Sequence, residues 1–323
     1  MKQTSKLLIL ATMPPPIGGV TVHIQRLLKY LDNNGYDYSF TDFRRSSKGT
    51  VWKQIRQHRY IHFHIYHPVV RFCFVLLGTV LGKKMLFTLH GNVGRHGWFY
   101  NLLDQYAFRV AYMPIVLNQR SFDQGRKWNS RTQLIGAFIP PQQEEQLQLT
   151  VWNAVSAFRN KYAIVFATNA STVSLDKAGN ETYQVSLLVK IFNKMPQAGL
   201  LISDASGKYR QYLKQQGHPI APNILLISEP HPFFEILKIA DVFLRITTTD
   251  GDSLSVKEAL FLEKQVLATD VVNRPPGTQL VGLNEWEIED AISKMQRSKT
   301  TYIPHRMING GEELLELYKQ TVA

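Results

Sequence analysis

Short apolar runs rich in β-branched residues alternate with helix-length segments along most of this 323-residue chain. The run Leu7 to Thr12, for example, is followed by a segment whose apolar residues recur at helical spacing until Asn34-Gly35. Such alternation predicts parallel sheets covered by helices. The strands that we expect are Leu7–Thr12, Tyr36–Phe43, Tyr60–Tyr66, Met85–His90, Ile115–Asn118, Tyr162–Thr168, Gly199–Ser203, Ile224–Ser228, Asp241–Thr247 and Val266–Asp270.

The alternation is interrupted once, at Ile139-Pro-Pro-Gln-Gln-Glu-Glu-Gln, because two successive prolines stop regular structure. We therefore predict an α/β fold with two Rossmann-like, doubly wound parallel-sheet domains. The predicted organisation is a first domain, a hinge with a helix, a second domain and a last helix that packs back on the first domain: 1–141, 142–161, 162–308 and 309–323.

Hydrophobic residues make up 44% of the chain, which is enough for two full cores. The single cysteine, Cys73, excludes an internal disulfide and is expected in the core of a protein from a reducing compartment. The first residues run directly into an apolar strand without the hydrophobic stretch of a signal peptide. These features favour a cytoplasmic protein.

The net charge of +12 is confined to the first half of the chain. Residues 1–150 hold 19 Lys and Arg against 7 Asp and Glu, whereas residues 151–323 hold 18 of each kind. This confinement favours a basic face for an anionic partner over a merely solubilising surface. Phospholipid, lipid pyrophosphate and nucleic acid all fit that charge, but the sequence contains no recognition helix or aromatic RNA-binding motif. We therefore expect no nucleic-acid partner.

The stretch 69–81 is the most apolar part of the first half, and it bears on a membrane role. It is too short to span a bilayer and contains Arg71. As a helix it is either a buried crossover helix or one that partly enters a membrane interface, and its composition favours burial.

The run from Asp250 to Glu258 sets two carboxylates eight positions apart around a turn that opens a helix. Gly251 allows a tight turn, and the free N–H groups that follow lie at a positive helix end, which binds anions such as a diphosphate. Asp250 is then placed to accept hydrogen bonds from sugar hydroxyls, and Glu258 to bind a ribose. The alternative is a capping box in which Ser255 and Glu258 bond each other's backbone N–H groups.

This run, with Val266-Leu-Ala-Thr-Asp270 and Arg274-Pro-Pro-Gly277 after it, resembles the donor site of family-4 glycosyltransferases. Their motif is a Glu, seven residues and a second Glu. Here the second position is Glu258, and the first is Asp250, which is one methylene shorter. The resemblance implies the type-B glycosyltransferase architecture, a cleft between two domains, and a retaining sugar transfer from a nucleoside diphosphate-sugar. It implies donor contacts from the turn residues Gly251, Asp252, Ser253, Leu254 and Ser255.

Further site residues follow from the same resemblance. Gly18-Gly19 after the first strand is similar to the glycine turn of these enzymes, and His90 at a strand end is similar to their active-site histidine, which bonds the donor sugar. In the second domain only Lys177 matches the diphosphate-binding lysine. The expected arginine is missing, and Arg245 either substitutes for it or is a buried ion-pair partner.

The resemblance and the basic first half together predict a lipid-linked saccharide acceptor at the inner face of a membrane, in the assembly of a surface polysaccharide. We expect no metal and no cofactor, because no Asp-x-Asp element outside the turn ends a strand. His62 and His64 share one strand face and provide a weak metal-site alternative. The alternative function is a non-catalytic sugar-nucleotide-binding partner subunit of the same fold, suggested by Asp250 and the missing arginine.

Overall fold

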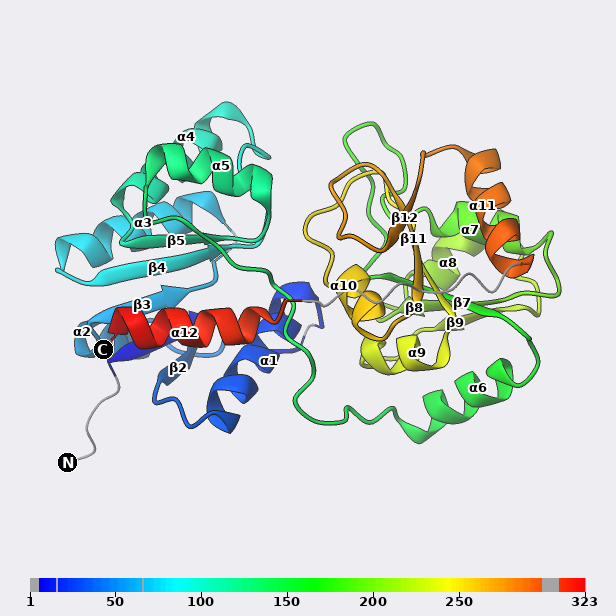
Figure 1. Ribbon diagram of the computed structural model, residues 1–323, viewed down its shortest axis with the longest axis horizontal. Coiled ribbons are helices and arrows are strands. Elements are labelled where there is room, and N and C mark those ends of the chain that lie inside the picture. The colour runs from blue at the N-terminus through cyan, green and yellow to red at the C-terminus, as the bar shows by residue number, and fades with distance from the viewer. Residues whose placement is uncertain (1–5, 16, 66, 298–307, 323) are drawn as a thin grey trace. The chain divides into compact units, whose positions relative to one another are not determined.

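The computed structural model describes residues 6–15, 17–65, 67–297 and 308–322, and these divide into two compact units (Figure 1). The first unit is formed by residues 1–142 together with 308–323, and the second by residues 143–307. Pro16 of the predicted glycine turn, Tyr66 at the end of a predicted strand, and the segment 298–307 before the predicted boundary at 308 lie outside the described residues.

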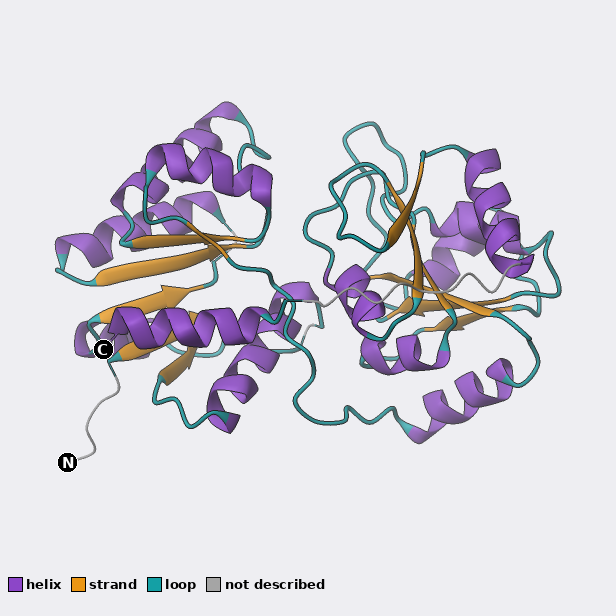
Figure 2. Cartoon of the chain, in the orientation of Figure 1, coloured by secondary structure: helices purple, strands orange, loops and turns teal. Residues whose placement is uncertain are grey.

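The first unit contains a six-stranded parallel sheet with the strand order β2-β1-β3-β4-β5-β6. All five residues of β1 are buried, because helices cover both faces of the sheet (Figure 2). The strands are β1 (Leu7–Ala11), β2 (Ser39–Asp42), β3 (Tyr60–Phe63), β4 (Lys84–Leu89), β5 (Met113–Val116) and β6 (Gln133–Leu134). The helices are α1 (Gly19–Asn33), α2 (Lys48–Gln57), α3 (Pro68–Val80), α4 (Trp98–Val110), α5 (Gln119–Trp128) and α12 (Gly310–Val322).

The last helix, α12, belongs to the core of the first unit. Leu314, Leu315 and Tyr318 are buried in the same hydrophobic cluster as Leu27 of α1 and Ile9 of β1. The Gly310 N–H donates to the Phe138 carbonyl at 2.7 Å, which fixes the start of the helix. The sheet face beside α1 is therefore closed by a segment that comes from the other end of the chain.

The second unit has a six-stranded parallel sheet with the order β12-β11-β10-β7-β8-β9. The predicted fold class, two Rossmann-like doubly wound parallel sheets, is confirmed. The strands are β7 (Val165–Ala170), β8 (Gly199–Asp204), β9 (Ile224–Ile227), β10 (Val242–Arg245), β11 (Gln265–Thr269) and β12 (Thr278–Val281). The helices are α6 (Leu149–Arg159), α7 (Val185–Phe192), α8 (Tyr209–Gln215), α9 (Phe233–Ile239), α10 (Leu254–Phe261) and α11 (Glu285–Arg297).

Helix α6, which follows the proline pair, packs in the core of the second unit. Its residues Val151, Val155 and Phe158 share a buried cluster with Val165 of β7 and Ile236 of α9. Arg159 near its end bonds Asp241 at 3.1 Å, in front of β10. The helix is thus integrated with the second sheet.

The apolar stretch 69–81 is less buried than its composition favours. In α3 the buried positions are Pro68, Arg71, Val75 and Gly78, at helical spacing, while large apolar residues on the other side are exposed. The prediction of a buried crossover helix was wrong for that outer side, and Cys73, expected in the core, is exposed. The exposed apolar side chains of this helix and its C-cap are Leu76, Leu77, Val80 and Leu81.

Arg71, the charged residue within this stretch, pairs with Asp104 of α4, and both side chains are 1% exposed. The guanidinium also donates to the Ile65 carbonyl at 3.0 Å. The pair therefore joins α3, α4 and the end of β3 under the apolar outer side of α3. Within the described ranges, no helix combines the length and the low polarity that crossing a bilayer requires.

We predict that Arg71→Met or Asp104→Asn lowers the free energy of unfolding by about 3 to 5 kcal/mol, because either change leaves a buried charge unpaired. Urea unfolding measures this loss. Asp290→Asn, which breaks an exposed ion pair with Lys294, is the control and should change stability by less than about 1 kcal/mol. Equal small effects at both pairs would contradict the assignment.

Candidate functional site

The strand order of the second sheet reverses between β7 and β10, so the two connections leaving these strands diverge there. In open α/β sheets ligands bind at such a switch point, outside the carboxyl ends of the strands. The segment that follows β10 is the turn 250–253, and α10 begins after it. The fold therefore places the predicted donor turn where a doubly wound sheet binds its ligands.

Asp250 is held by two arginines instead of standing free (its side chain is 8% exposed). Arg245 donates to both carboxylate oxygens, from Nε and Nη2, at 2.9 Å each. Arg274 Nη1 donates to Oδ2 at 2.7 Å, and the Gly251 N–H donates to Oδ1 at 3.0 Å. Because a carboxylate has about four lone-pair sites, these four donors fill it.

The charges in this cluster strongly lower the pKa of Asp250. Burial alone would raise the pKa of Asp250, but the guanidinium groups of Arg245 and Arg274 outweigh it and lower that pKa to about 2. The carboxylate is thus ionised at neutral pH. Two guanidinium groups and one carboxylate leave the cluster with one net positive charge.

The start of α10 is capped by Ser253, whose hydroxyl accepts from the Val256 N–H at 3.5 Å. The capping-box alternative, with Ser255 as the cap, is wrong: Ser255 lies inside the helix, and Asn169 of β7 donates to its hydroxyl at 2.8 Å. The same Asn169 accepts from Arg245 at 3.2 Å. One amide thus links β7, β10 and the first turn of α10.

The remaining turn residues lie close to this cap. Asp252 pairs with Lys257 at 2.5 Å, and both side chains are 12% exposed, so the carboxylate nearest the helix N-terminus is neutralised locally. Leu254 is the first residue of α10. Glu258 lies on the next turn and is 4% exposed, which places its carboxylate inside the unit beside the switch point.

The loop after β7 forms a hairpin that carries Lys177 at its exposed tip. Its base is joined to the turn side, since the Thr248 N–H donates to the Thr182 carbonyl at 3.0 Å. Among the described residues, no ion pair of Lys177 is found, and the structure does not bring it into contact with Arg245 or Asp250. Two roles were expected for Arg245, a substitute for the missing arginine or a buried ion-pair partner. The structure shows the second, since Arg245 pairs with Asp250.

The N-terminus of α7, the other helix end that leaves the switch point, is already occupied. Glu181 Oε1 accepts from the Val185 N–H at 2.8 Å and from the Ser186 N–H at 3.3 Å. A protein carboxylate thus takes the place that an anion would need. The start of α10 is therefore the better anion site of the two.

In the first unit the strand order reverses between β1 and β3, and Gly18 and Gly19 follow β1 at the start of α1. Gly18 has an extended φ of −166°, and a Cβ at either position would meet nothing within 4 Å. Neither backbone strain nor packing requires glycine here. Open space over the helix start is what a closely approaching ligand needs.

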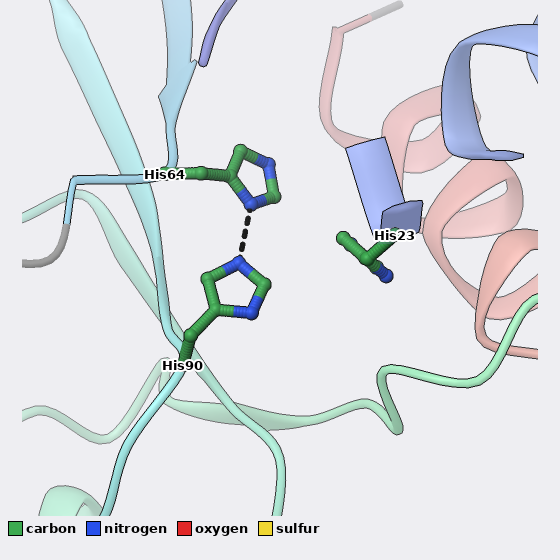
Figure 3. A group of neighbouring side chains, drawn as sticks. All are labelled: His23, His64 and His90. Carbon is green, nitrogen blue, oxygen red and sulfur yellow. Dashed lines mark hydrogen bonds between the residues drawn. The ribbon is translucent and has the colours of Figure 1, made fainter. Parts of the chain in front are cut away.

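His90 follows β4 and lies in a group with His23 of α1 and His64, which follows β3 (Figure 3). His64 Nδ1 and His90 Nε2 are 2.9 Å apart. His23 Nδ1 bonds the Ala137 carbonyl at 2.8 Å. Burial, with the neighbouring histidines, lowers the pKa of both His64 and His90 well below 6.5, so both rings are neutral at pH 7.

His62 and His64 were the weak metal-site alternative, but His62 bonds two hydroxyl groups instead. Its Nδ1 bonds the Tyr318 hydroxyl of α12 at 2.5 Å, and its Nε2 bonds the Thr88 hydroxyl at 2.8 Å. Burial lowers its pKa to about 3. Both ring nitrogens are thus engaged within the core, and the ring contacts His64 only through a tilted ring pair, at a centroid distance of 4.3 Å.

Three members of these clusters were not predicted as site residues from the sequence. His23 continues the buried stripe of α1 with Leu27 and Leu31, and a polar residue on that apolar stripe was a usable signal. Arg274 was noted only within the family motif. Asn169 gives no local signal, because its role depends on β7 lying next to β10.

No protein-family model matches the sequence, and no curated protein matches it significantly. In three dimensions the chain is similar to Anabaena Alr3699/HepE in complex with UDP-glucose, with 12% identity over 97% of this chain and 94% of that one and a TM-score of 0.67. It is similar to WaaG, a glycosyltransferase involved in lipopolysaccharide biosynthesis, with 11% identity over 98% of this chain and 95% of that one and a TM-score of 0.60. It is also similar to UDP-GlcNAc 2-epimerase from Methanocaldococcus jannaschii, with 13% identity over 97% of this chain and 99% of that one and a TM-score of 0.63. These similarities show the type-B glycosyltransferase fold.

We predict that Asp250→Asn lowers the free energy of unfolding at pH 7 by about 3 kcal/mol, because it leaves two guanidinium groups without their anion. The folded-state pKa of Asp250 lies below the unfolded value, so its contribution is present above about pH 4 and is lost as the pH falls towards 2. Urea unfolding of both proteins at several pH values measures the difference.

The stability gap between wild type and Asp250→Asn should therefore shrink as the pH falls from 4. Asp270→Asn, at an exposed position of the same unit, is the matched control and should show no such gap. A gap that is already absent at pH 7 would refute the ion-pair assignment.

Proposed function

We propose that this protein is a retaining glycosyltransferase that moves a sugar from a nucleoside diphosphate-sugar to a lipid-linked saccharide acceptor. The observation that carries the proposal is the position of the 250–258 segment, at the switch point of a Rossmann-like sheet. Neighbours of this fold were solved with UDP and UDP-glucose, which supports UDP as the first nucleotide to test.

The donor diphosphate binds at the start of α10. The N–H groups of Leu254 and Ser255 provide the positive helix end, and the arginine cluster adds one net positive charge beside it. Lys177 reaches the leaving diphosphate from its hairpin. These groups stabilise the developing negative charge without a metal ion.

Asp250 acts mainly through the arginines. Since its four lone-pair sites are filled, a sugar hydroxyl reaches it only by displacing one donor, and we assign Asp250 the positioning of Arg245 and Arg274. Glu258, buried one turn further along α10, binds the vicinal hydroxyls of the ribose. His90 bonds the donor sugar, and the open start of α1 at Gly18-Gly19 admits the substrate.

An apolar surface with basic residues nearby, the α3–α4 outer face, supports the lipid-linked acceptor of this proposal. We define it by Leu76, Leu77 and Val80 of α3 and by Trp98, Phe99 and Tyr106 of α4, all exposed. Helix α4 also packs against α5, which ends in Arg126 and Lys127 (Figure 1). Aromatic side chains beside basic ones favour contact with an anionic membrane surface.

A pocket of 470 Å³ lies between α4 and α5 and shares Trp98 with this face; it is also lined by Leu102, Lys127 and Trp128. Indole rings beside an ammonium group suit a lipid-linked phosphate. We therefore place the protein on the cytoplasmic face of a membrane, in surface-polysaccharide assembly, a role also suggested by the lipopolysaccharide function of WaaG.

A second function, a non-catalytic sugar-nucleotide-binding partner, is favoured by one observation, the filled carboxylate of Asp250. It predicts nucleotide binding without turnover. Sugar epimerases share the fold as well, so product analysis has to separate transfer, epimerisation and binding alone.

We predict that the protein binds one nucleoside diphosphate, UDP first, and that Glu258→Gln weakens this binding about tenfold or more through loss of the charged ribose contact. Calorimetry measures the affinity. Sugar transfer to a lipid-linked acceptor, followed by mass spectrometry, should persist in excess chelator. Glu263→Gln, at an exposed position just after α10, is the control.

Failure to bind any nucleoside diphosphate would overturn the donor site. Binding without transfer would support the partner function, and conversion of the free sugar nucleotide would indicate an epimerase. Loss of transfer in chelator would refute the metal-independent step.

We also predict that the protein floats with anionic liposomes at low salt and that Trp98→Ala reduces the bound fraction several-fold, because this indole is 80% exposed on the α3–α4 outer face. Trp286→Ala is the matched control, since Trp286 is 66% exposed on α11, in the half of the chain with zero net charge. No flotation at low salt, or equal loss in both variants, would reject this surface.

A further inference from the structure

The three histidines at the switch point of the first sheet come from three separate elements. His23 lies on α1, and His64 and His90 follow β3 and β4, so their side chains converge at the carboxyl ends of the central strands (Figure 3). We propose that His23, His64 and His90 bind a transition-metal ion of the Zn²⁺ class.

The separations suit such an ion after a small adjustment. One ligand nitrogen from each ring lies within 4.8 Å of the other two. Zinc–nitrogen bonds of about 2.0 to 2.1 Å in a tetrahedral site place two nitrogens about 3.3 Å apart. No separation therefore has to shrink by more than about 1.5 Å.

The hydrogen bond of His23 is of the kind that a metal ligand needs. Its Nδ1 lies 2.8 Å from the Ala137 carbonyl, an acceptor only, so Nδ1 carries the proton and Nε2 carries the lone pair. Metal-binding histidines almost always donate their second ring N–H to a carbonyl or carboxylate in this way. The tautomer of His23 is thus set for coordination through Nε2.

The pair His64 and His90 contributes the second argument. Their nitrogens, His64 Nδ1 and His90 Nε2, face each other at 2.9 Å, and His64 Nε2 is buried with no hydrogen-bond partner in the described part of the chain. If His64 Nδ1 donates to His90, the only lone pair of the neutral His90 ring is occupied and His90 cannot bind an ion. If a metal ion takes the place of the shared proton, His64 Nδ1 and His90 Nε2 both bind it through the lone pairs that face each other. The site therefore requires the tautomer in which His64 carries its proton on Nε2.

The donor set also selects the class of ion. Three imidazoles without a carboxylate favour borderline metals such as Zn²⁺, Co²⁺, Ni²⁺ or Cu²⁺ and disfavour Mg²⁺ and Ca²⁺, which require oxygen ligands. Three protein ligands leave a fourth position for water or an anion. His62 contacts the His64 ring, but both of its nitrogens are bonded by Tyr318 and Thr88, so it is not a ligand.

One consequence rests on the proposed function. His90 is the residue assigned to the donor sugar, and coordination takes one of its two ring nitrogens and holds the ring toward His23 and His64, so the ion competes with the sugar for this ring. The ion would therefore inhibit sugar transfer and not assist it. Chelator-resistant transfer and a metal site in the same protein are then compatible.

Metal binding is tested directly on the full chain with its purification tag removed. Co²⁺ is titrated into the protein and its visible ligand-field absorption is followed, and Zn²⁺ affinity is measured by competition with a chromogenic chelator. We expect one ion per chain with a tetrahedral spectrum, displaced by Zn²⁺ and unaffected by excess Mg²⁺. His23→Gln, His64→Gln and His90→Gln should each weaken Zn²⁺ binding about 100-fold or more.

His218→Gln, in the second unit, is the control and should bind like wild type. Circular dichroism and thermal unfolding show whether each variant is folded, and one folded ligand variant is enough to decide. Stoichiometric binding lost in that variant supports the site; no binding, or binding that all variants retain, overturns it. Because the readout is metal binding, it stays separate from the transfer assay, where Zn²⁺ inhibition tests only the consequence for His90.

Discussion

The second unit depends on the ion-pair cluster of Asp250 with Arg245 and Arg274. Arg245 ends β10, Arg274 follows β11, and Asp250 sits in the turn between them, so a single carboxylate ties two strand ends and the approach to α10 together. Its desolvation is offset because every lone pair has a donor. The direction of α10, and with it the place of Glu258, follows from this turn.

The same cluster explains why a shorter carboxylate is compatible with this site. A glutamate at 250 would project its charge one methylene further, past the plane where Arg245 donates from both Nε and Nη2. The aspartate keeps the charge close to its own strand end. The short side chain at position 250 and the two arginines that bond it are therefore parts of one arrangement.

Sequence periodicity predicted ten of the strands because most of them are short apolar runs buried on both faces, as in β1 and β8; β2 is only partly buried. It missed β6, which has two residues, and β12, whose middle residues are exposed, since neither has a strand's apolar pattern. Within the candidate site, the two carboxylates were proposed from a local motif and His90 from the family resemblance. The roles of Arg274, Asn169 and His23 depend on neighbours far along the chain. The polar His23 on an apolar stripe and the motif around Arg274 were local signals, whereas Asn169 gave none.

The origin of α12 in the last part of the chain has a consequence for the order in which the protein folds. During synthesis the strands of the first sheet emerge early, but Leu314, Leu315 and Tyr318 follow after the whole second unit. The second unit is continuous and can complete its core first. Until α12 is made, the sheet face beside α1 stays partly uncovered and His62 lacks the Tyr318 hydroxyl, so the part of the chain made first is the part whose core is completed last.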